Sequence, residues 1–255
     1  MEVISMRFFR KFIDTLLGNK DKEVDGAQIL DKTDKNDWDV PESLSDRQIP
    51  RLESEKISLN LETSIIISKE FYVIDTETTG LERFKDRIVE LALIKYKNGK
   101  IEDTFHSLIK PGFPMPEKAS SINNITDNML LHAPDEAEVI KSAREFLRPV
   151  LEGKVILCGH NADFHVSFFI NALRRHKYPC DIKFIDTLSE SRRYISVPYN
   201  YKLSSLSNYL GIEHLAPHRA NSDAQACGEL MLFINKDFIK KEPINSSDDD
   251  LFYTF

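Results

Sequence analysis

A short apolar segment that runs straight into two carboxylates constrains the fold and chemistry of this chain most. Residues 71–76 read as a buried strand, and Asp75 and Glu77 stand two positions apart at its end. Because side chains alternate along a strand, both carboxylates point to one face. Two unpaired carboxylates on a core strand are costly without a cation, and their hard oxygen atoms suit Mg²⁺ or Mn²⁺. The segment predicts a metal site, with a solvated strand end as the simpler alternative.

A histidine and an aspartate further along the chain supply a candidate second half of this site. Pro217 places His218 in a loop, and Asp223 falls in the first turns of the helix that follows. The helix dipole alone would also stabilise a carboxylate at that position. A histidine titrates near neutral pH, so His218 could take a proton from a water molecule. We therefore predict a catalytic set of Asp75, Glu77, His218 and Asp223.

The order of strand and helix signals predicts an α/β fold. Residues 88–97 and 100–109 read as two strands joined at Asn98-Gly99, which is a strong hairpin signal. Strands that first form a meander and then alternate with helices give a mixed sheet flanked by helices. The other expected strands cover residues 71–76, 154–158 and 182–186, and the expected helices cover residues 135–151, 164–176, 203–210 and 220–235.

Composition divides the 255 residues into four parts. We predict an amphipathic helix over residues 1–17, a polar linker over residues 18–56, a folded domain over residues 57–240 and an acidic-aromatic tail over residues 241–255. The domain is long enough to bury one sizeable core.

Charge and cysteine content narrow the class of protein. A formal net charge of −7 argues against a protein that coats long duplexes, but not against an enzyme that grips the last few nucleotides. Cys158, Cys180 and Cys227 lack metal-type spacing, so we predict reduced thiols in a cytoplasmic protein. The longest apolar runs are the length of a strand, and we expect no transmembrane segment.

Several motifs in a fixed order give the chain a family resemblance. The series opens with Asp75-Thr76-Glu77-Thr78-Thr79-Gly80-Leu81, continues through residues 86–92 and Asp186-Thr187-Leu188, and closes with His218-Arg219-Ala220-Asn221-Ser222-Asp223. This order, from about residue 71 to residue 234, resembles the DEDDh 3′→5′ exonuclease family. That family includes the proofreading epsilon subunit of bacterial DNA polymerase III and RNase T.

The resemblance implies a ribonuclease H-like fold and phosphodiester hydrolysis with two divalent cations, Mg²⁺ or Mn²⁺. Asp75 would bridge both cations, Glu77 and Asp223 would complete the first metal site, and His218 would deprotonate the attacking water. Nucleoside 5′-monophosphates would be released. The residues implied to contact or shape the substrate site are Thr76, Thr78, Thr79 and Asn161.

The middle segment, Ile125-Thr126-Asp127, has Asn123-Asn124 where the family usually has His-Gly, and the fourth acid position also departs from the family pattern. The second family motif usually ends in aspartate, its fourth acid, whereas here His160-Asn161-Ala162-Asp163-Phe164-His165 ends in histidine. Asp163 stands two residues earlier, roughly 200° around a helix, and would point nearly away from the cleft.

Four hypotheses follow for this position. His165 ligates the metal directly, which would favour Mn²⁺ or a softer ion. Alternatively, Asp163 supplies the carboxylate through a local adjustment. The second cation could instead be held poorly, with weak or absent activity. In the simplest case, His165 lines a helix surface.

Two functions of different classes are consistent with these features. The first is a 3′→5′ exonuclease that acts on single-stranded DNA or RNA ends in replication or repair. The second is a catalytically weakened end-binding or adaptor module. A polymerase or another replication or repair protein could dock on residues 1–17 or 241–255. A His165 that points into the cleft of Asp75 and Glu77 favours the enzyme.

Overall fold

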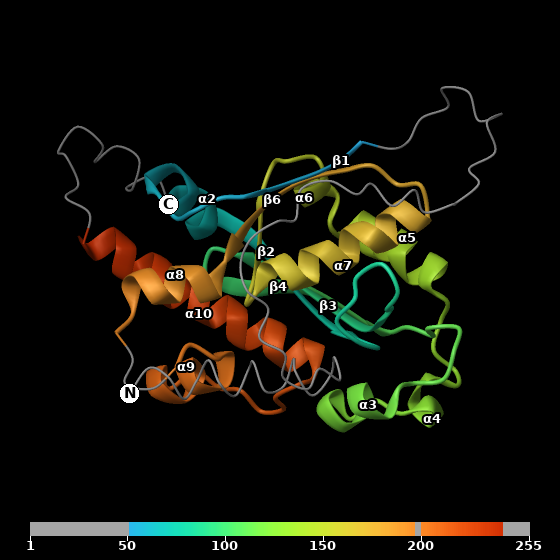
Figure 1. Cartoon of the computed structure of the whole chain (residues 1–255). Coiled ribbons are helices and arrows are strands. Elements are labelled where there is room, and N and C mark those ends of the chain that lie inside the picture. Colours follow the sequence, from blue (N-terminus) through green and yellow to red (C-terminus); the bar gives the residue numbers. More distant parts are fainter. Residues whose placement is uncertain (1–50, 197–199, 242–255) are drawn as a thin grey trace, which may run out of the picture. The chain divides into compact units, whose positions relative to one another are not determined.

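The computed structural model describes residues 51–196 and 200–241, which form one six-stranded sheet with helices packed on both faces (Figure 1). The strands are β1 (Leu52–Lys56), β2 (Glu70–Thr78), β3 (Ile88–Lys97), β4 (Lys100–Leu108), β5 (Ile156–Gly159) and β6 (Cys180–Asp186). The helices are α2 (Leu61–Lys69), α3 (Glu117–Asn123), α4 (Asp127–Leu130), α5 (Glu136–Phe146), α6 (Arg148–Leu151), α7 (Ala162–Arg175), α8 (Thr187–Tyr194), α9 (Leu203–Leu210) and α10 (Ala220–Lys241).

The sheet is mixed, with strand order β1-β6-β5-β2-β3-β4. Strands β1, β6, β5 and β2 run parallel to their neighbours, whereas β2, β3 and β4 pair antiparallel. The hairpin between β3 and β4 turns at Asn98 and Gly99, with φ values of 51° and 72°, as this turn type requires. The predicted mixed α/β sheet is confirmed.

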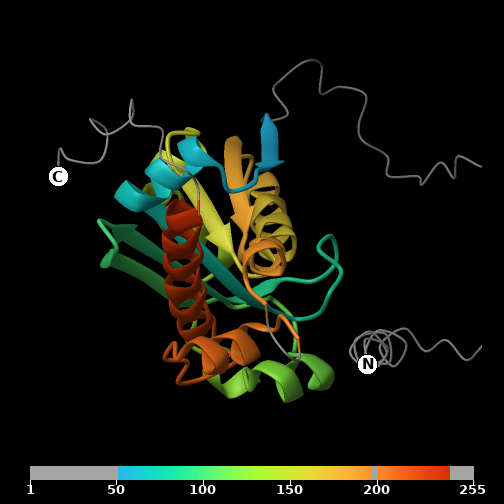
Figure 2. The same cartoon turned by 90° about the vertical axis from the view of Figure 1, so that its left-hand side faces the viewer.

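Strand β2 lies in the middle of the sheet and divides the core in two. Phe71 and Val73 pack into the cluster that contains α10, and Tyr72 and Ile74 pack into the cluster that contains α5 and α7. Figure 2 shows α10 and α7 on opposite sides of the sheet. Because side chains alternate, Asp75 and Glu77 fall on the face covered by α10, and Thr76 falls on the face covered by α7.

Several elements differ from the sequence-based expectations. Strand β1 lies inside the range predicted as a linker, so the folded region begins by Leu52. The predicted helix over residues 135–151 is split into α5 and α6 because Pro149, which has no backbone N–H, follows the break at Leu147. Lys241 belongs to α10 and not to the predicted tail. The sequence reasoning missed helices α2, α3, α4 and α8.

Two of these elements are set by side-chain caps. The apolar run within α2 has the length of a strand, but Asn60 and Thr63 form a reciprocal capping box that starts a helix. Asp186 similarly accepts a hydrogen bond from the Leu188 N–H and starts α8. None of the helices within the described residues is long and apolar enough to cross a membrane. The predictions for residues 1–17 and 242–255 lie outside the described residues.

Candidate active site

Three carboxylates meet where β2 ends and α10 begins. Asp75 and Glu77 project from β2, and Asp223 lies in the first turn of α10. One oxygen of each carboxylate can be chosen so that all three lie within 4.8 Å of one another. The structure therefore brings together the three acids that the sequence assigned to the first metal site. Three hard oxygen donors at this spacing fit a divalent cation such as Mg²⁺ or Mn²⁺.

The electrostatics of the cluster also favour a cation. Burial, followed by the neighbouring carboxylates of Asp223 and Glu77, raises the pKa of Asp75 well above its ordinary value. Burial, followed by the charges of Asp223 and Glu90, raises the pKa of Glu77 to about 8. Burial also raises the pKa of Asp223. Like charges that disfavour one another in this way are relieved when a bound cation balances them.

His218 lies on the exposed loop before α10, next to Asp223. Its backbone is in the left-handed region, with φ of 64°, and its N–H donates to Asp223 Oδ2 over 3.3 Å. Burial raises the pKa of Asp223, and the nearby His218 opposes this rise. The predicted general base therefore stands beside the acid cluster and is open to solvent.

A second histidine that the sequence reasoning missed holds the same carboxylate. His214 Nε2 lies 2.5 Å from Asp223 Oδ1, and the side chain of His214 is buried. Its Nδ1 atom is buried without a hydrogen-bond partner among the described residues. His214 therefore fixes the orientation of Asp223. The available signal was a second histidine four residues before His218 in the same loop.

A buried glutamate anchors the segment between His218 and Asp223. Glu90 on β3 accepts hydrogen bonds from both Nε and Nη2 of Arg219 and from the Ala220 N–H, and lies 2.8 Å from His106 Nε2. Burial acts to raise the pKa of Glu90, but hydrogen bonds with His106, Arg219 and Ala220 lower it to about 2. Glu90 thereby ties the start of α10 to the sheet.

The histidine at the departing motif position points into the site. His165 lies on α7, is 8% exposed, and places Nε2 3.4 Å from Asp75 Oδ1. Its Nδ1 accepts a hydrogen bond of 3.0 Å from the Thr76 N–H. Burial lowers the pKa of His165 to about 4, although a backbone hydrogen bond with His160 opposes this shift. The ring is thus neutral at physiological pH, and it does not line an outer helix surface.

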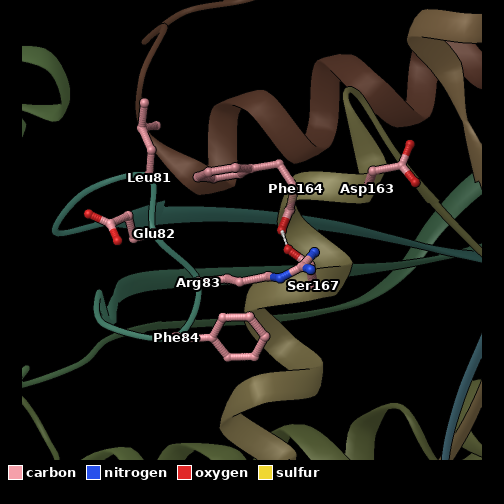
Figure 3. A pocket seen from close by; sticks show the side chains of 7 residues that line it. All are labelled: Leu81, Glu82, Arg83, Phe84, Asp163, Phe164 and Ser167. Carbon is pink, nitrogen blue, oxygen red and sulfur yellow. Dashed lines mark hydrogen bonds between the residues drawn. The ribbon is translucent and has the colours of Figure 1, made fainter. Parts of the chain in front are cut away.

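Asp163, the alternative fourth acid, is directed elsewhere. Helix α7 begins at Ala162, so no irregular backbone brings Asp163 into the site. Its carboxylate pairs with Lys56 Nζ at 2.5 Å, and its side chain is 59% exposed. Figure 3 shows the Asp163 carboxylate directed away from the loop that carries Leu81. The structure does not bring Asp163 to the acid cluster.

Three of the predicted substrate residues, Thr76, Thr78 and Thr79, lie on β2 or directly after it. The Thr78 hydroxyl donates to the Gly80 carbonyl over 2.6 Å, and the Thr79 hydroxyl donates to Asp86 over 3.0 Å. Asn161 precedes α7 with φ of 62°. A Cβ atom at Gly80 would lie 2.4 Å from Asp86 Oδ2, so a larger residue would push the Asp86 carboxylate out of its hydrogen bonds with Thr79 and Glu82. The Thr78 and Thr79 side chains brace the turn, whereas the Thr76 N–H donates to His165.

A groove adjoins the start of α7, the helix that carries His165. It has a volume of about 440 Å³ and lies between the loop after β2 and α7 (Figure 3). Phe84 is 66% exposed and Leu81 is 50% exposed, and the guanidinium of Arg83 sits 5.1 Å from the centre of the Phe84 ring. The groove thus presents an exposed aromatic ring and a guanidinium group, and it is also lined by Phe164, whose ring contacts that of His165.

The sequence of this chain matches a protein-family model and several bacterial proteins. A family model described as Exonuclease matches residues 72–231. The chain is 38% identical over 176 residues to the DNA polymerase III PolC-type of Lacticaseibacillus paracasei, and the match covers 69% of this chain and 12% of that protein. It is 34% identical over 191 residues to the DNA polymerase III PolC-type of Bacillus subtilis, covering 72% and 13%. The chain therefore spans only 12% and 13% of the length of these two relatives.

Two solved structures share the fold. Exonuclease I of E. coli in complex with a dT13 oligonucleotide matches with a TM-score of 0.60 and 20% identity, covering 68% of this chain and 42% of that one. The nuclease domain of 3′hExo, described as a DEDDh family member bound to rAMP, matches with a TM-score of 0.57 and 20% identity, covering 67% and 93%. These matches confirm the predicted ribonuclease H-like arrangement of a mixed sheet between helices.

Proposed function

Since the chain belongs to the exonuclease family, we propose that it removes nucleotides one at a time from the 3′ end of single-stranded DNA or RNA. Family membership confirms the resemblance predicted from the motifs and identifies the chain as a metal-dependent exonuclease. The observation that carries the proposal is the cluster of Asp75, Glu77 and Asp223 with His218 beside it on an exposed loop.

The proposed chemistry is hydrolysis of the terminal phosphodiester. A cation held by Asp75, Glu77 and Asp223 would supply positive charge to the oxygens of the attacked phosphate. His218 would accept a proton from the attacking water as the water oxygen bonds to phosphorus. The bond from phosphorus to the O3′ of the preceding nucleotide would break, this O3′ would take a proton from solvent to become the new 3′-hydroxyl of the strand, and a nucleoside 5′-monophosphate would be released. The second cation of the predicted two-metal mechanism would need a fourth carboxylate, and His165 stands in that position.

We assign the path of the strand beyond the terminal nucleotide to the groove beside α7. Its exposed Phe84 ring can stack on a base, and Arg83 can approach a phosphate. Two acidic residues line the groove, and each forms an ion pair: Glu82 with Lys85 and Asp163 with Lys56. Such pairing lowers the electrostatic cost of bringing a phosphate backbone into the groove.

The substitution Phe84→Ala tests this path. Loss of one stacking platform, worth about 1–3 kcal/mol per base, should raise KM for a single-stranded oligonucleotide by roughly 5- to 150-fold. The kcat value should change by less than about twofold, because Phe84 does not touch the acid cluster. Phe233→Ala, an exposed phenylalanine on α10 outside the groove, is the matched control. An equal effect of both substitutions would rule out the groove.

The test of the proposed function uses 5′-labelled single-stranded DNA and its RNA counterpart, each with Mg²⁺, Mn²⁺ or chelator. We expect a ladder that shortens from the 3′ end with metal and intact strands with chelator. The sugar and the metal that give the faster ladder define the preferred substrate and cation. Intact strands with every metal would contradict the proposal and favour the adaptor role.

The PolC-type relatives support a partner as well as an activity. Those relatives are named as DNA polymerases, and this chain matches only 12% of the length of the Lacticaseibacillus paracasei protein. We propose that this chain works beside a polymerase or another replication protein, through residues 1–17 or 241–255. The cytoplasmic location predicted from its reduced cysteines fits such a role; Cys158, Cys180 and Cys227 are all buried free thiols.

A further inference from the structure

His165 bears directly on how many cations the site can hold. Nδ1 of His165 accepts the Thr76 backbone N–H, and a backbone amide can only donate. A neutral imidazole has one lone pair on its ring nitrogens, so the remaining proton must lie on Nε2. The Nε2–H group faces Asp75 Oδ1 across 3.4 Å. In this tautomer neither ring nitrogen offers a lone pair to a metal.

The burial of His165 keeps the ring in this arrangement. The side chain is 11% exposed and stacks edge-on against Phe164, with ring centroids 5.3 Å apart. The Thr76 hydroxyl also lies 3.0 Å from Nδ1. Turning the ring would leave the Thr76 amide without its acceptor inside the protein, and an unpaired buried amide is unfavourable.

No other acid among the described residues replaces the missing fourth carboxylate. Asp163 is held by Lys56 on the surface. Asp186 accepts hydrogen bonds from the backbone N–H groups of Asn161 and Leu188 and also pairs with Lys56. The described residues whose ligand atoms lie mutually within 4.8 Å are Asp75, Glu77 and Asp223, and His165 is not among them.

We propose that this chain binds a single divalent cation at Asp75, Glu77 and Asp223, and that His165 closes the position of a second one. The Nε2–H of His165 occupies the side of Asp75 that would otherwise face a second cation. The remaining ligands are all oxygen atoms, so the histidine does not convert the site into one for a softer metal. This proposal rests on the proposed function for the identity of the metal site.

Cation stoichiometry tests the proposal independently of turnover. Titration of Mn²⁺ into the full chain, followed by calorimetry in the presence of thymidine 5′-monophosphate, should give about one bound ion per chain. His165→Asp should raise this to about two, because it restores a fourth carboxylate. The same change at an exposed histidine, His132→Asp, should leave it at about one. Two ions in the parent chain, or one in His165→Asp, would overturn the proposal.

The tautomer gives a second measurement that needs no substitution. In chain labelled with ¹⁵N-histidine, the His165 ring should show a protonated Nε2 and an unprotonated Nδ1, and saturating Mg²⁺ should leave both assignments unchanged. A protonated Nδ1, or a metal-induced shift of Nε2 typical of coordination, would contradict the proposal even if His165→Asp fails to fold. One bound ion without any cleavage would contradict the proposed exonuclease function and leave the single-cation proposal standing. Two bound ions together with cleavage would contradict the single-cation proposal and leave the exonuclease function standing.

Discussion

Asp75→Asn should lower kcat/KM by at least about 10³-fold, equivalent to about 4 kcal/mol of lost transition-state stabilisation. Asn keeps the shape of the side chain but removes the charge of the central ligand. The same substitution should stabilise the chain in chelator, on the order of 1 kcal/mol above neutral pH, because it removes a carboxylate whose pKa is raised by burial and by the charges of Asp223 and Glu77. Activity and stability should therefore move in opposite directions.

The two readouts are measured on one preparation, with single-turnover cleavage for activity and thermal unfolding in chelator for stability. Asp237→Asn is the matched control, because Asp237 pairs with Lys241 in the last turns of α10, far along the helix from Asp223. It should leave cleavage unchanged. A less stable Asp75→Asn chain in chelator would show that the carboxylates do not repel one another as their raised pKa values indicate.

The local features of the site were readable from the sequence. A buried strand that ends in Asp75 and Glu77, and a histidine five residues before Asp223, depend only on short-range patterns. Strand β3 and helix α9 match their expected bounds for the same reason, since the Asn98-Gly99 turn and Gly211 mark their C-terminal ends directly. The order of the family motifs then joins the two halves of the site, which lie far apart in the chain.

The features that the sequence reasoning missed depend on distant partners. Strand β1 is a polar, largely exposed segment that pairs with β6, about 130 residues away in the chain, and nothing in its own composition marks it as a strand. Glu90 reads as one more charged residue on β3 until Arg219 is brought beside it. Likewise, the direction of the His165 ring follows from the Thr76 amide and not from helical periodicity.

The acid cluster and the Glu90 contacts have opposite energetic roles. Asp75, Glu77 and Asp223 are held close together although burial and mutual repulsion disfavour their charges. Glu90 is a charged group whose pKa is lowered, so its interactions stabilise the folded chain. Because Glu90 fixes Arg219 and Ala220, it also holds the loop that carries His218. The stabilising contacts of Glu90 thus lie next to the acid cluster, whose buried charges are unfavourable.

Glu90→Gln should destabilise the chain by about 3 kcal/mol at pH 7, because the amide weakens several charge-assisted hydrogen bonds at a fully buried position. Arg219 is partly exposed and recovers some hydration, which keeps the loss below that of a wholly buried pair. Chemical denaturation of parent and variant measures the difference. Glu138→Gln on α5, an exposed glutamate, should change stability by less than about 0.5 kcal/mol.

The loss should also depend on pH in one direction. The pKa of Glu90 is lowered from 4.5 to about 2 in the folded chain, so its stabilisation is fully present above pH 4.5. As the pH falls from 4.5 towards 2, the parent should lose this contribution and the variant should not, and their unfolding free energies should converge. If the difference in unfolding free energy between parent and variant stays constant from pH 7 to pH 3, the glutamine destabilises the chain through its shape. The charge of Glu90 would then not hold the start of α10.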